Sequence, residues 1–169
     1  VDTATPEQID QVKANIENYN PGAQILQARS PVTVSEPDRI RGKRVLVVED
    51  GPTLTHGGMA YGAGVIAARN FGASIVVDPR PFASGTIKKT LRTYGHIGNL
   101  LPAMGYSPVQ IADLEKTINN ADCNLVLFAT PIQLTRILEI NKPAIRVLYD
   151  YEDEGDPTLE RALLERLPV

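Results

Sequence analysis

The sequence predicts an α/β fold whose sheet is mostly parallel and Rossmann-like. Short β-branched runs alternate with segments of helical spacing along all 169 residues, which is the pattern of strand–helix–strand units. A capping residue followed by proline marks four helix starts, at Thr5-Pro6, Ser107-Pro108, Thr130-Pro131 and Asp156-Pro157. Apolar residues make up 43% of the chain, which is enough for one substantial core.

Five strands and about six helices are expected in alternation. The strands are the apolar runs at residues 23–28, 44–49, 74–77, 124–129 and 144–149. The helices are the segments at residues 6–19, 59–71, 85–94, 108–120, 131–139 and 157–167. Residues 44–49 (RVLVVE) predict the clearest buried strand, because apolar residues run through it without alternation. Residues 30–42 are expected to form a loop, and the acidic segment 150–156 is expected to be solvated and flexible.

The composition limits the classes of partner. With 17 Lys and Arg against 20 Asp and Glu, the formal charge is −3 and the charges are scattered, so no nucleic-acid partner is expected. No apolar run approaches the roughly 20 residues of a membrane helix, and no signal peptide is visible, so a cytoplasmic protein without a membrane partner is expected. The single cysteine, Cys123, has no internal disulfide partner and is expected to be a small core residue.

Residues 49–58 (EDGPTLTHGG) form the first candidate site, because parallel α/β sheets bind ligands in loops at the carboxyl ends of strands, here after Glu49, Val77 and Ala129. Glu49, Asp50 and His56 are candidate catalytic residues, and the two carboxylates are also candidate ligands of Mg²⁺. The other candidate contacts to a ligand are Thr53, Thr55, Gly57 and Gly58. The amides of these two glycines, near a predicted helix N-terminus, suit an anion. The alternative is a tight strand-to-helix turn in which the histidine is a hydrogen-bonded spacer.

Residues 78–89 (DPRPFASGTIKK) form the second candidate site. A helix start combined with positive charge suits a phosphate, and Arg80 and Lys88 are candidate catalytic cations there. The candidate contacts at the helix start are Ser84, Gly85 and Thr86. The alternative is an ordinary capped helix whose lysines face solvent.

Residues 94–106 form a third segment of interest. His96 is a candidate acid or base, and the loop is a candidate lid or interface. The alternative is a packed, irregular connection. Thr130-Pro131 is interpreted first as a helix cap and second as a ligand contact. Neither a zinc-ligand spacing nor a nucleophile motif is present in the sequence.

Four stretches of the sequence resemble a known family: VLVVEDGPTLTHGGMAYGAG, VDPRPFASGTIK, HIGNLLPAMGY and ATPI. They are similar to proteins described as predicted GTPases or as cyclic 2,3-diphosphoglycerate synthetases, and the resemblance runs from residue 1 to about residue 167. It implies that this chain is the C-terminal part of a P-loop NTPase-like protein more than twice as long, whose P-loop lies upstream.

The resemblance also implies a nucleotide-base site near the start of the chain. Val1-Asp2 resembles the end of an N-K-V-D guanine-recognition motif, and residues 20–30 resemble the second base-contacting loop of P-loop GTPases. Asp2, Ala28 and Ser30 are then the candidate contacts to the base of ATP or GTP. Residues 1–30 would end the nucleotide-binding domain, and residues 41–169 would form a C-terminal α/β domain.

The activity implied is NTP-driven formation of an intramolecular phosphoanhydride. Mg²⁺, ATP or GTP, a small anionic phosphorylated substrate, an upstream P-loop-bearing segment or chain, and a homo-oligomeric state are expected. Without the P-loop, these residues alone should not hydrolyse a nucleotide. The alternatives are a GTPase with another role, a module that binds an anionic metabolite without catalysis, and a structural half that dimerises through residues 94–106.

Overall fold

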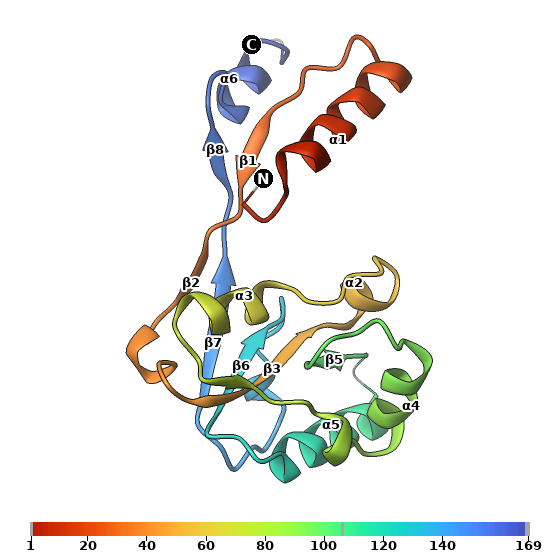
Figure 1. The fold of residues 1–169 in the computed structure, drawn as a ribbon, viewed down its shortest axis with the longest axis vertical. Coiled ribbons are helices and arrows are strands. Elements are labelled where there is room, and N and C mark those ends of the chain that lie inside the picture. Colours follow the sequence, from red (N-terminus) through yellow and green to blue (C-terminus); the bar gives the residue numbers. More distant parts are fainter. Residues whose placement is uncertain (1, 106, 168–169) are drawn as a thin grey trace. The chain divides into compact units, whose positions relative to one another are not determined.

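The computed structural model describes residues 2–105 and 107–167, and the chain divides into two compact units (Figure 1). The first unit holds residues 1–31 and 149–169, and the second unit holds residues 32–148. Two predictions include residues outside the described part, because the base motif contains Val1 and the third segment contains Tyr106.

The second unit is built on a six-stranded sheet within the described residues. Its order is β2-β7-β6-β3-β4, and β5 also pairs with β3. The strands are β2 (Val32–Val34), β3 (Arg44–Asp50), β4 (Ile75–Val76), β5 (Leu101–Ala103), β6 (Leu125–Ala129) and β7 (Ala144–Tyr149). Strand β3 is parallel to β4, β5 and β6, and β6 is parallel to β7, which confirms the predicted fold class.

Strand β3 lies inside this sheet because it is apolar on both faces. Its residues 45–48 are all completely buried, as predicted for an uninterrupted apolar run. Residues 45–49 pair with residues 125–129 of β6 along one edge. The other edge is shared, with β4 at the start of β3 and β5 at its end.

The strand order creates a topological switch point between β3 and β6. After β3 the chain passes to β4 and β5 on one side, and it then returns to β6 on the other side. In open α/β sheets, ligands bind outside the carboxyl ends of the strands at such a point. The loops after Glu49 and Ala129, two of the three loops predicted to bind a ligand, begin there.

Helices of the second unit pack against this sheet and against each other. They are α2 (Gly51–Thr55), α3 (Ala63–Asn70), α4 (Gly85–Thr93) and α5 (Pro108–Asn120). Helix α3 contacts β2, β3 and β6, whereas α4 contacts β5 and α5. Helix α5 begins as predicted, because Ser107 and Gln110 form a reciprocal capping box.

The first unit holds two helices and a two-stranded sheet within its described residues. These are α1 (Pro6–Tyr19), β1 (Gln27–Arg29), β8 (Glu152–Glu154) and α6 (Leu159–Leu164). The expectation that residues 150–156 are flexible is wrong, because β8 pairs antiparallel with β1. Asp153 also accepts hydrogen bonds from the Tyr151 hydroxyl and the Leu159 N–H group, at 2.5 and 2.8 Å.

The first unit buries very little apolar surface. Helix α1 has the predicted capping box at Thr5, yet none of its 14 residues is buried. Among the described residues of this unit, Ala162 is the one buried hydrophobic residue, whereas Tyr19 is 85% exposed. A unit of this size with so small a core gains little stability from apolar burial.

Some predicted and observed elements differ. The predicted helix at residues 131–139 is wrong. The Thr130 hydroxyl donates to the Ile132 carbonyl at 2.7 Å, and a 3₁₀ turn at Leu134–Arg136 follows. Elements β2, α2 and β5 lie where loops were expected, because segments of three to five residues are too short to show a period. Among residues 2–105 and 107–167, no helix has the length and apolar character needed to cross a bilayer.

Candidate functional site

The carboxyl ends of β3 and β6 bring polar side chains together at the switch point. Glu49 pairs in register with Ala129, so Asp50 and Thr130 follow on neighbouring parallel strands. Glu49 and Thr130 are 4% and 3% exposed, while Asp50 is half-buried. The structure therefore places the first predicted segment at the sheet edge where α/β proteins bind ligands.

Glu49 caps helix α3 from the neighbouring strand. Its Oε1 atom accepts hydrogen bonds from the backbone N–H groups of Gly64 and Val65, at 2.9 and 3.1 Å. These N–H groups belong to the first turn, where an α-helix leaves its donors without partners. The protein's own carboxylate thus occupies a position where a helix N-terminus would otherwise receive an anion.

Two glycines allow this close approach. A Cβ atom on Gly62 would lie 2.7 Å from Glu49 Oε2, and one on Gly64 would lie 2.6 Å from Val47 Cγ1. A larger side chain at either position would force a neighbour to move. Neither glycine was predicted as a site residue, because both lie inside the helix expected at residues 59–71, whereas α3 begins at Ala63.

Burial changes the proton affinity of Glu49. Desolvation raises the pKa of its carboxyl group from 4.5 to about 7. The backbone hydrogen bonds to this carboxylate oppose the rise, because they stabilise the charged form, and the neighbouring charge of Asp50 adds to it. A carboxyl group that titrates near neutrality is suited to general acid or base catalysis.

Asp50 differs from Glu49 in its access to a ligand. Its Oδ2 atom accepts a 2.9 Å hydrogen bond from Thr53 Oγ1. Protein-bound Mg²⁺ commonly has one or two carboxylate ligands together with substrate phosphates. Asp50 fits this role because it is half-buried, whereas two amides already hold the Oε1 atom of Glu49, whose predicted role as a metal ligand stays a prediction. In the described part of the chain, no cluster of three or more His, Cys, Asp or Glu residues is placed to hold a metal.

The rest of the first segment forms α2 and the turn after it. Thr55 donates its hydroxyl to the carbonyl four residues earlier at 3.0 Å, and His56 is exposed at the end of the helix. Gly57 and Gly58 follow, the latter with φ of 66°. The expectation that these two glycines lie at a helix N-terminus is wrong, because α3 begins at Ala63 and the glycines end α2 instead.

The third predicted segment packs onto the first. His96 Nε2 lies 2.9 Å from the Leu54 carbonyl oxygen, which is 42 positions away in the sequence. The Gly98 N–H group donates to the Ala60 carbonyl at 2.9 Å. The His96 ring also meets the Tyr94 ring edge-on, with centroids 6.1 Å apart. This loop is therefore a packed neighbour of the switch-point edge.

Arg80 joins the second segment to the same loop. Its guanidinium group pairs with Asp78 at 2.9 Å and donates hydrogen bonds to the carbonyl oxygens of Ile97 and Gly98. These contacts hold the loop after α4 against the turn before it. The predicted role of Arg80 on an anionic substrate stays a prediction.

The start of α4 is closed by a second carboxylate. Asp113 Oδ2 of α5 accepts hydrogen bonds from the Thr86 N–H group at 2.7 Å and from the Thr86 hydroxyl at 2.9 Å. The same bonds hold the pKa of Asp113 below its usual value. Ser84 donates its N–H group to Thr117 Oγ1 at 3.0 Å, and Gly85 lies directly against the Asp113 carboxylate. The three predicted phosphate contacts thus meet α5, a partner that no sequence signal identified.

Lys88 is exposed on α4. Within the residues that the structure describes, no hydrogen bond or ion pair links it to Glu49 or Asp50, whose recorded partners lie in the loop and helix starts after β3. Its predicted catalytic role stays a prediction.

In the first unit, two of the three predicted base contacts meet. The Asp2 carboxylate accepts a hydrogen bond from the Ser30 backbone N–H group. Ala28 lies two residues earlier in β1, opposite Asp153 of β8. Asp2 and Ser30 are exposed, and Ala28 is half-buried. The two segments that resemble base-contacting loops are therefore adjacent at Asp2 and Ser30.

The chain is similar to one part of a longer protein. No family model matches the chain. The chain is 52% identical over 165 residues to a protein of Thermococcus kodakarensis named arginine synthetase ArcE. The match covers 98% of this chain, and the chain spans 37% of the length of this curated relative. The chain is therefore homologous to one part of a larger synthetase.

Proposed function

We propose that this chain is part of a synthetase that uses a nucleoside triphosphate with Mg²⁺ to drive bond formation, with arginine as the product. The 52% identity to an arginine synthetase over nearly the whole chain supports this proposal. The structural observation that carries it is Glu49, a buried carboxyl group with a pKa of about 7 at the switch point. Bond formation by an attacking N–H or O–H group requires proton removal, which such a carboxylate performs near neutral pH.

The residues around Glu49 have complementary roles in this proposal. Glu49 accepts the proton of the attacking group. Asp50, with Thr53 beside it, would hold Mg²⁺, which neutralises charge on the phosphate of an anionic phosphorylated substrate. The loop around His96 packs on α2 beside this edge, and His56 at the end of α2 would contact the substrate. These are proposals for the intact enzyme.

The nucleotide is proposed to bind mainly to an upstream P-loop-bearing segment or chain, with the first unit of this chain completing its domain. The exposed apolar residues of α1 and α6 support this division, because they need further protein to cover them. Asp2, Ala28 and Ser30 would lie beside the base. A carboxylate at Asp2 accepts hydrogen bonds from the N1–H and 2-amino groups of guanine, a pattern that adenine lacks, so base preference tests this assignment.

The test uses the full-length protein that contains this chain and runs the reaction backwards. Arginine should drive formation of ATP or GTP from the nucleoside diphosphate and phosphate, or from the monophosphate and pyrophosphate. Glu49→Gln should lower this rate at least tenfold. Glu115→Gln is the matched control, because Glu115 also accepts a backbone N–H bond, from Glu139 at 2.8 Å, but lies on α5.

The outcomes separate the candidates. No arginine-dependent nucleotide formation, or equal losses in the two variants, would contradict the proposal. Nucleotide hydrolysis stimulated by 2,3-diphosphoglycerate and indifferent to arginine would instead support the cyclic 2,3-diphosphoglycerate synthetase implied by the sequence resemblance. Hydrolysis of GTP that depends on neither compound would support a GTPase with another role.

A further inference from the structure

Helix α4 carries three cations on the side away from the core. Ile87 and Leu91 are 1% and 5% exposed and belong to the hydrophobic core, whereas Lys88, Lys89 and Arg92 are exposed. Among residues 2–105 and 107–167, none of the ion pairs involves these three side chains. They are called the α4 basic cluster below.

The two lysines of the α4 basic cluster have no stabilising role in the helix itself. Lys88 and Arg92 are four positions apart, a spacing at which like charges destabilise a helix. Arg92 in the last turn complements the negative end of the helix dipole, but Lys88 and Lys89 lie too far from that end to do so. The charges of the two lysines are therefore available for a ligand.

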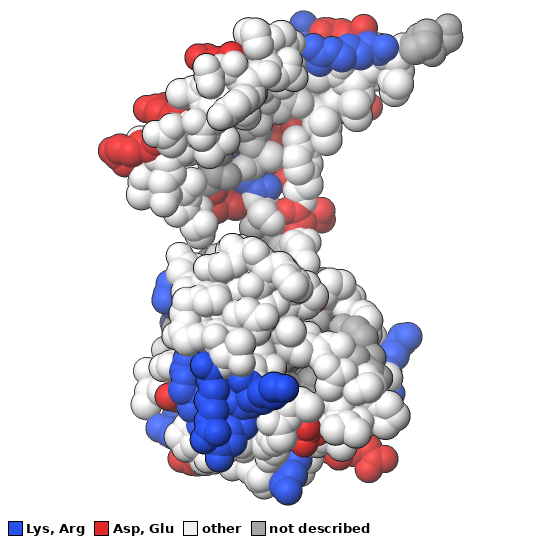
Figure 2. All heavy atoms as spheres, turned by 90° about the vertical axis from the view of Figure 1, so that its right-hand side faces the viewer, with Lys and Arg blue, Asp and Glu red and all other residues white. Residues whose placement is uncertain are grey.

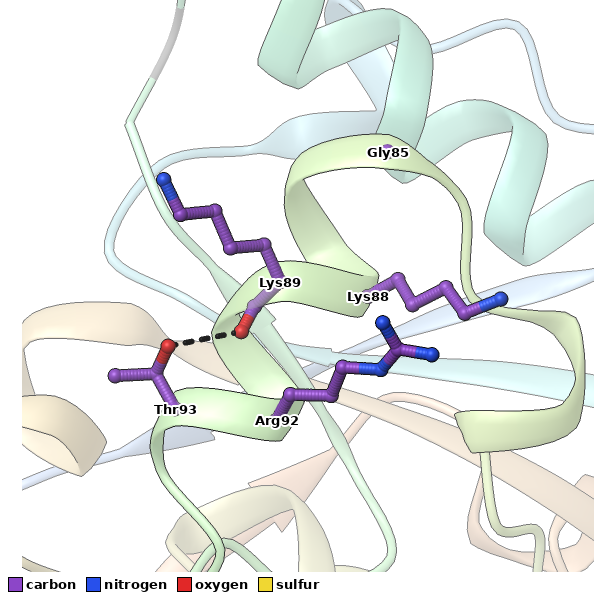
Figure 3. Close-up of a pocket in the computed structure, with 5 residues that line it drawn as sticks. All are labelled: Gly85, Lys88, Lys89, Arg92 and Thr93. Atoms are coloured by element: carbon purple, nitrogen blue, oxygen red, sulfur yellow. Dashed lines mark hydrogen bonds between the residues drawn. The ribbon is translucent and has the colours of Figure 1, made fainter.

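The cluster lines a cavity. Together with Gly85 and Thr93, the three cations border an open cavity of about 340 Å³ (Figure 3). Figure 3 shows the side chains of Lys88 and Arg92 extending to the same side of α4, with their charged ends close to each other, while Lys89 extends to the other side. The Thr93 hydroxyl donates to the Lys89 carbonyl at 3.1 Å. The volume suits a small ligand.

The charge of the surrounding unit favours an anion. The second unit has 13 basic and 9 acidic residues, a formal charge of +4, whereas the first unit has 4 basic and 11 acidic residues, a formal charge of −7. Figure 2 shows Lys and Arg gathered on the face of the second unit that carries α4. The net positive charge of this unit attracts negative ligands.

Asp113, the carboxylate at the start of α4, forms no ion pair with the cluster within the described residues. Asp113 is already bound to the N–H group and hydroxyl of Thr86 at the start of α4. Because the Thr86 N–H group already has this partner, the charge that attracts an anion to the cavity comes from the side chains of the cluster. A guanidinium group binds phosphate oxygens in pairs, and ammonium groups bind them as point charges.

We propose that Lys88 and Arg92, with Lys89 at the border of the cavity, form a binding site for a small ligand that carries at least two negative charges on phosphate groups. All residues that line the cavity belong to α4, and none belongs to β3, β6 or the loops that follow them. The site is therefore additional to the switch-point edge and does not depend on the proposed synthetase reaction.

The test is calorimetric titration of the 169-residue chain with inorganic phosphate, pyrophosphate, tripolyphosphate and ATP. Affinity should rise with the number of phosphate groups and fall between about 50 and 200 mM salt, because the site is exposed. The variant Lys88→Ala/Arg92→Ala should bind pyrophosphate at least tenfold more weakly. The matched control, Arg41→Ala/Lys43→Ala, removes the same two charges from exposed positions of the same unit and should change affinity less than twofold.

Each arm decides the proposal. Equal weakening in both double variants would overturn it, because the binding would then follow the charge of the whole unit. Binding of ATP without binding of pyrophosphate or tripolyphosphate would also overturn it, because recognition would then require the nucleoside. Tight binding of pyrophosphate and tripolyphosphate would confirm a site for phosphate groups, and the added affinity of ATP would show whether a nucleotide is its source. The single variant Lys89→Ala is expected to retain the fold and to bind more weakly. Circular dichroism of this variant excludes misfolding as the cause of its weaker binding.

Discussion

Two helices of the second unit begin against a carboxylate from another element. The pKa values of the two carboxyl groups are shifted in opposite directions. Glu49 of β3 accepts N–H bonds of 2.9 and 3.1 Å at the start of α3, and its pKa rises to about 7. Asp113 of α5 accepts bonds of 2.7 and 2.9 Å at the start of α4, and its pKa falls. The hydrogen bonds are similar, but Glu49 is 4% exposed while Asp113 is only half-buried.

Burial, and not the capping hydrogen bond, decides whether the pKa of each carboxyl group is raised or lowered. At Glu49 the loss of water outweighs the hydrogen bonds, so the acid form is favoured up to near-neutral pH. At Asp113 water remains close, so the hydrogen bonds dominate and the charged form is favoured. One carboxylate is thus a candidate for proton transfer, and the other is a structural cap.

The largest expected effect is that of Glu49→Ala. The substitution leaves the N–H groups of Gly64 and Val65 without an acceptor in a buried place, and it opens a cavity beside Val47. Each unsatisfied buried N–H group costs about 1–3 kcal/mol, so we expect the free energy of unfolding to fall by about 3–5 kcal/mol at pH 5.5. Urea denaturation measures this difference. A loss below about 1 kcal/mol would show that water or another acceptor takes the place of the Glu49 side chain as partner of these N–H groups.

The second prediction concerns the pH dependence of stability. The pKa of Glu49 is about 7 in the folded chain and 4.5 in the reference state, so the folded state binds the proton more tightly. Stability conferred by the protonated form is therefore complete below pH 4.5 and is lost as pH rises to about 7. Relative to Glu49→Gln, which does not titrate, the unmodified chain should lose roughly 3 kcal/mol across this range.

Urea unfolding at a series of pH values between 5 and 8 measures that loss. Asp113→Asn is the control, and its difference from the unmodified chain should stay constant over this range. Because the folded pKa of Asp113 lies below its reference value of 3.8, its contribution is present above that value and disappears only in more acidic solution. Parallel curves for the unmodified chain and Glu49→Gln would refute the role of burial at Glu49.

The smallest expected effect is that of Asp113→Ala. Loss of a carboxylate cap at a solvent-accessible helix start costs about 1 kcal/mol, less than at Glu49, because water replaces the lost acceptor. Amide hydrogen exchange at Thr86 should become faster, while exchange at Gly64 should not change. Asp113→Asn retains an acceptor at this position. It should keep more than half of the stability that Asp113→Ala loses. An effect as large as that of Glu49→Ala would remove the contrast between the two helix starts.

The long periodic elements could be predicted closely from the sequence, whereas the short ones were predicted with other bounds, as for β1 and β4, or not at all. Strands β3, β6 and β7 and helices α1, α4 and α5 lie within a residue or two of the predicted bounds, because apolar runs and capping residues act over neighbouring positions. Strands β1, β2, β5 and β8 depend on pairing with distant partners. The acidic strand β8 shows this most clearly, since its composition favoured a solvated segment but its backbone pairs with β1.

The sequence identified the segments that form the candidate site but not the contacts between them. Placing the first segment at the carboxyl end of a buried strand required only the run at residues 44–49. Which groups meet there required the tertiary structure: His96 lies against Leu54, and Arg80 binds the loop at residues 97–98. The predicted anion sites at helix starts were interpreted from local pattern, which does not show a carboxylate arriving from another element.

The sequence by itself determined the α/β class, the buried strand β3 and the capped starts of α1 and α5, because apolar runs and caps act over a few neighbouring residues. The tertiary structure decided that Glu49 closes α3 and Asp113 closes α4, through contacts 15 and 27 positions apart. It also decided that the first of these carboxylates titrates near neutrality, because the depth of burial is set by the packing of the whole sheet.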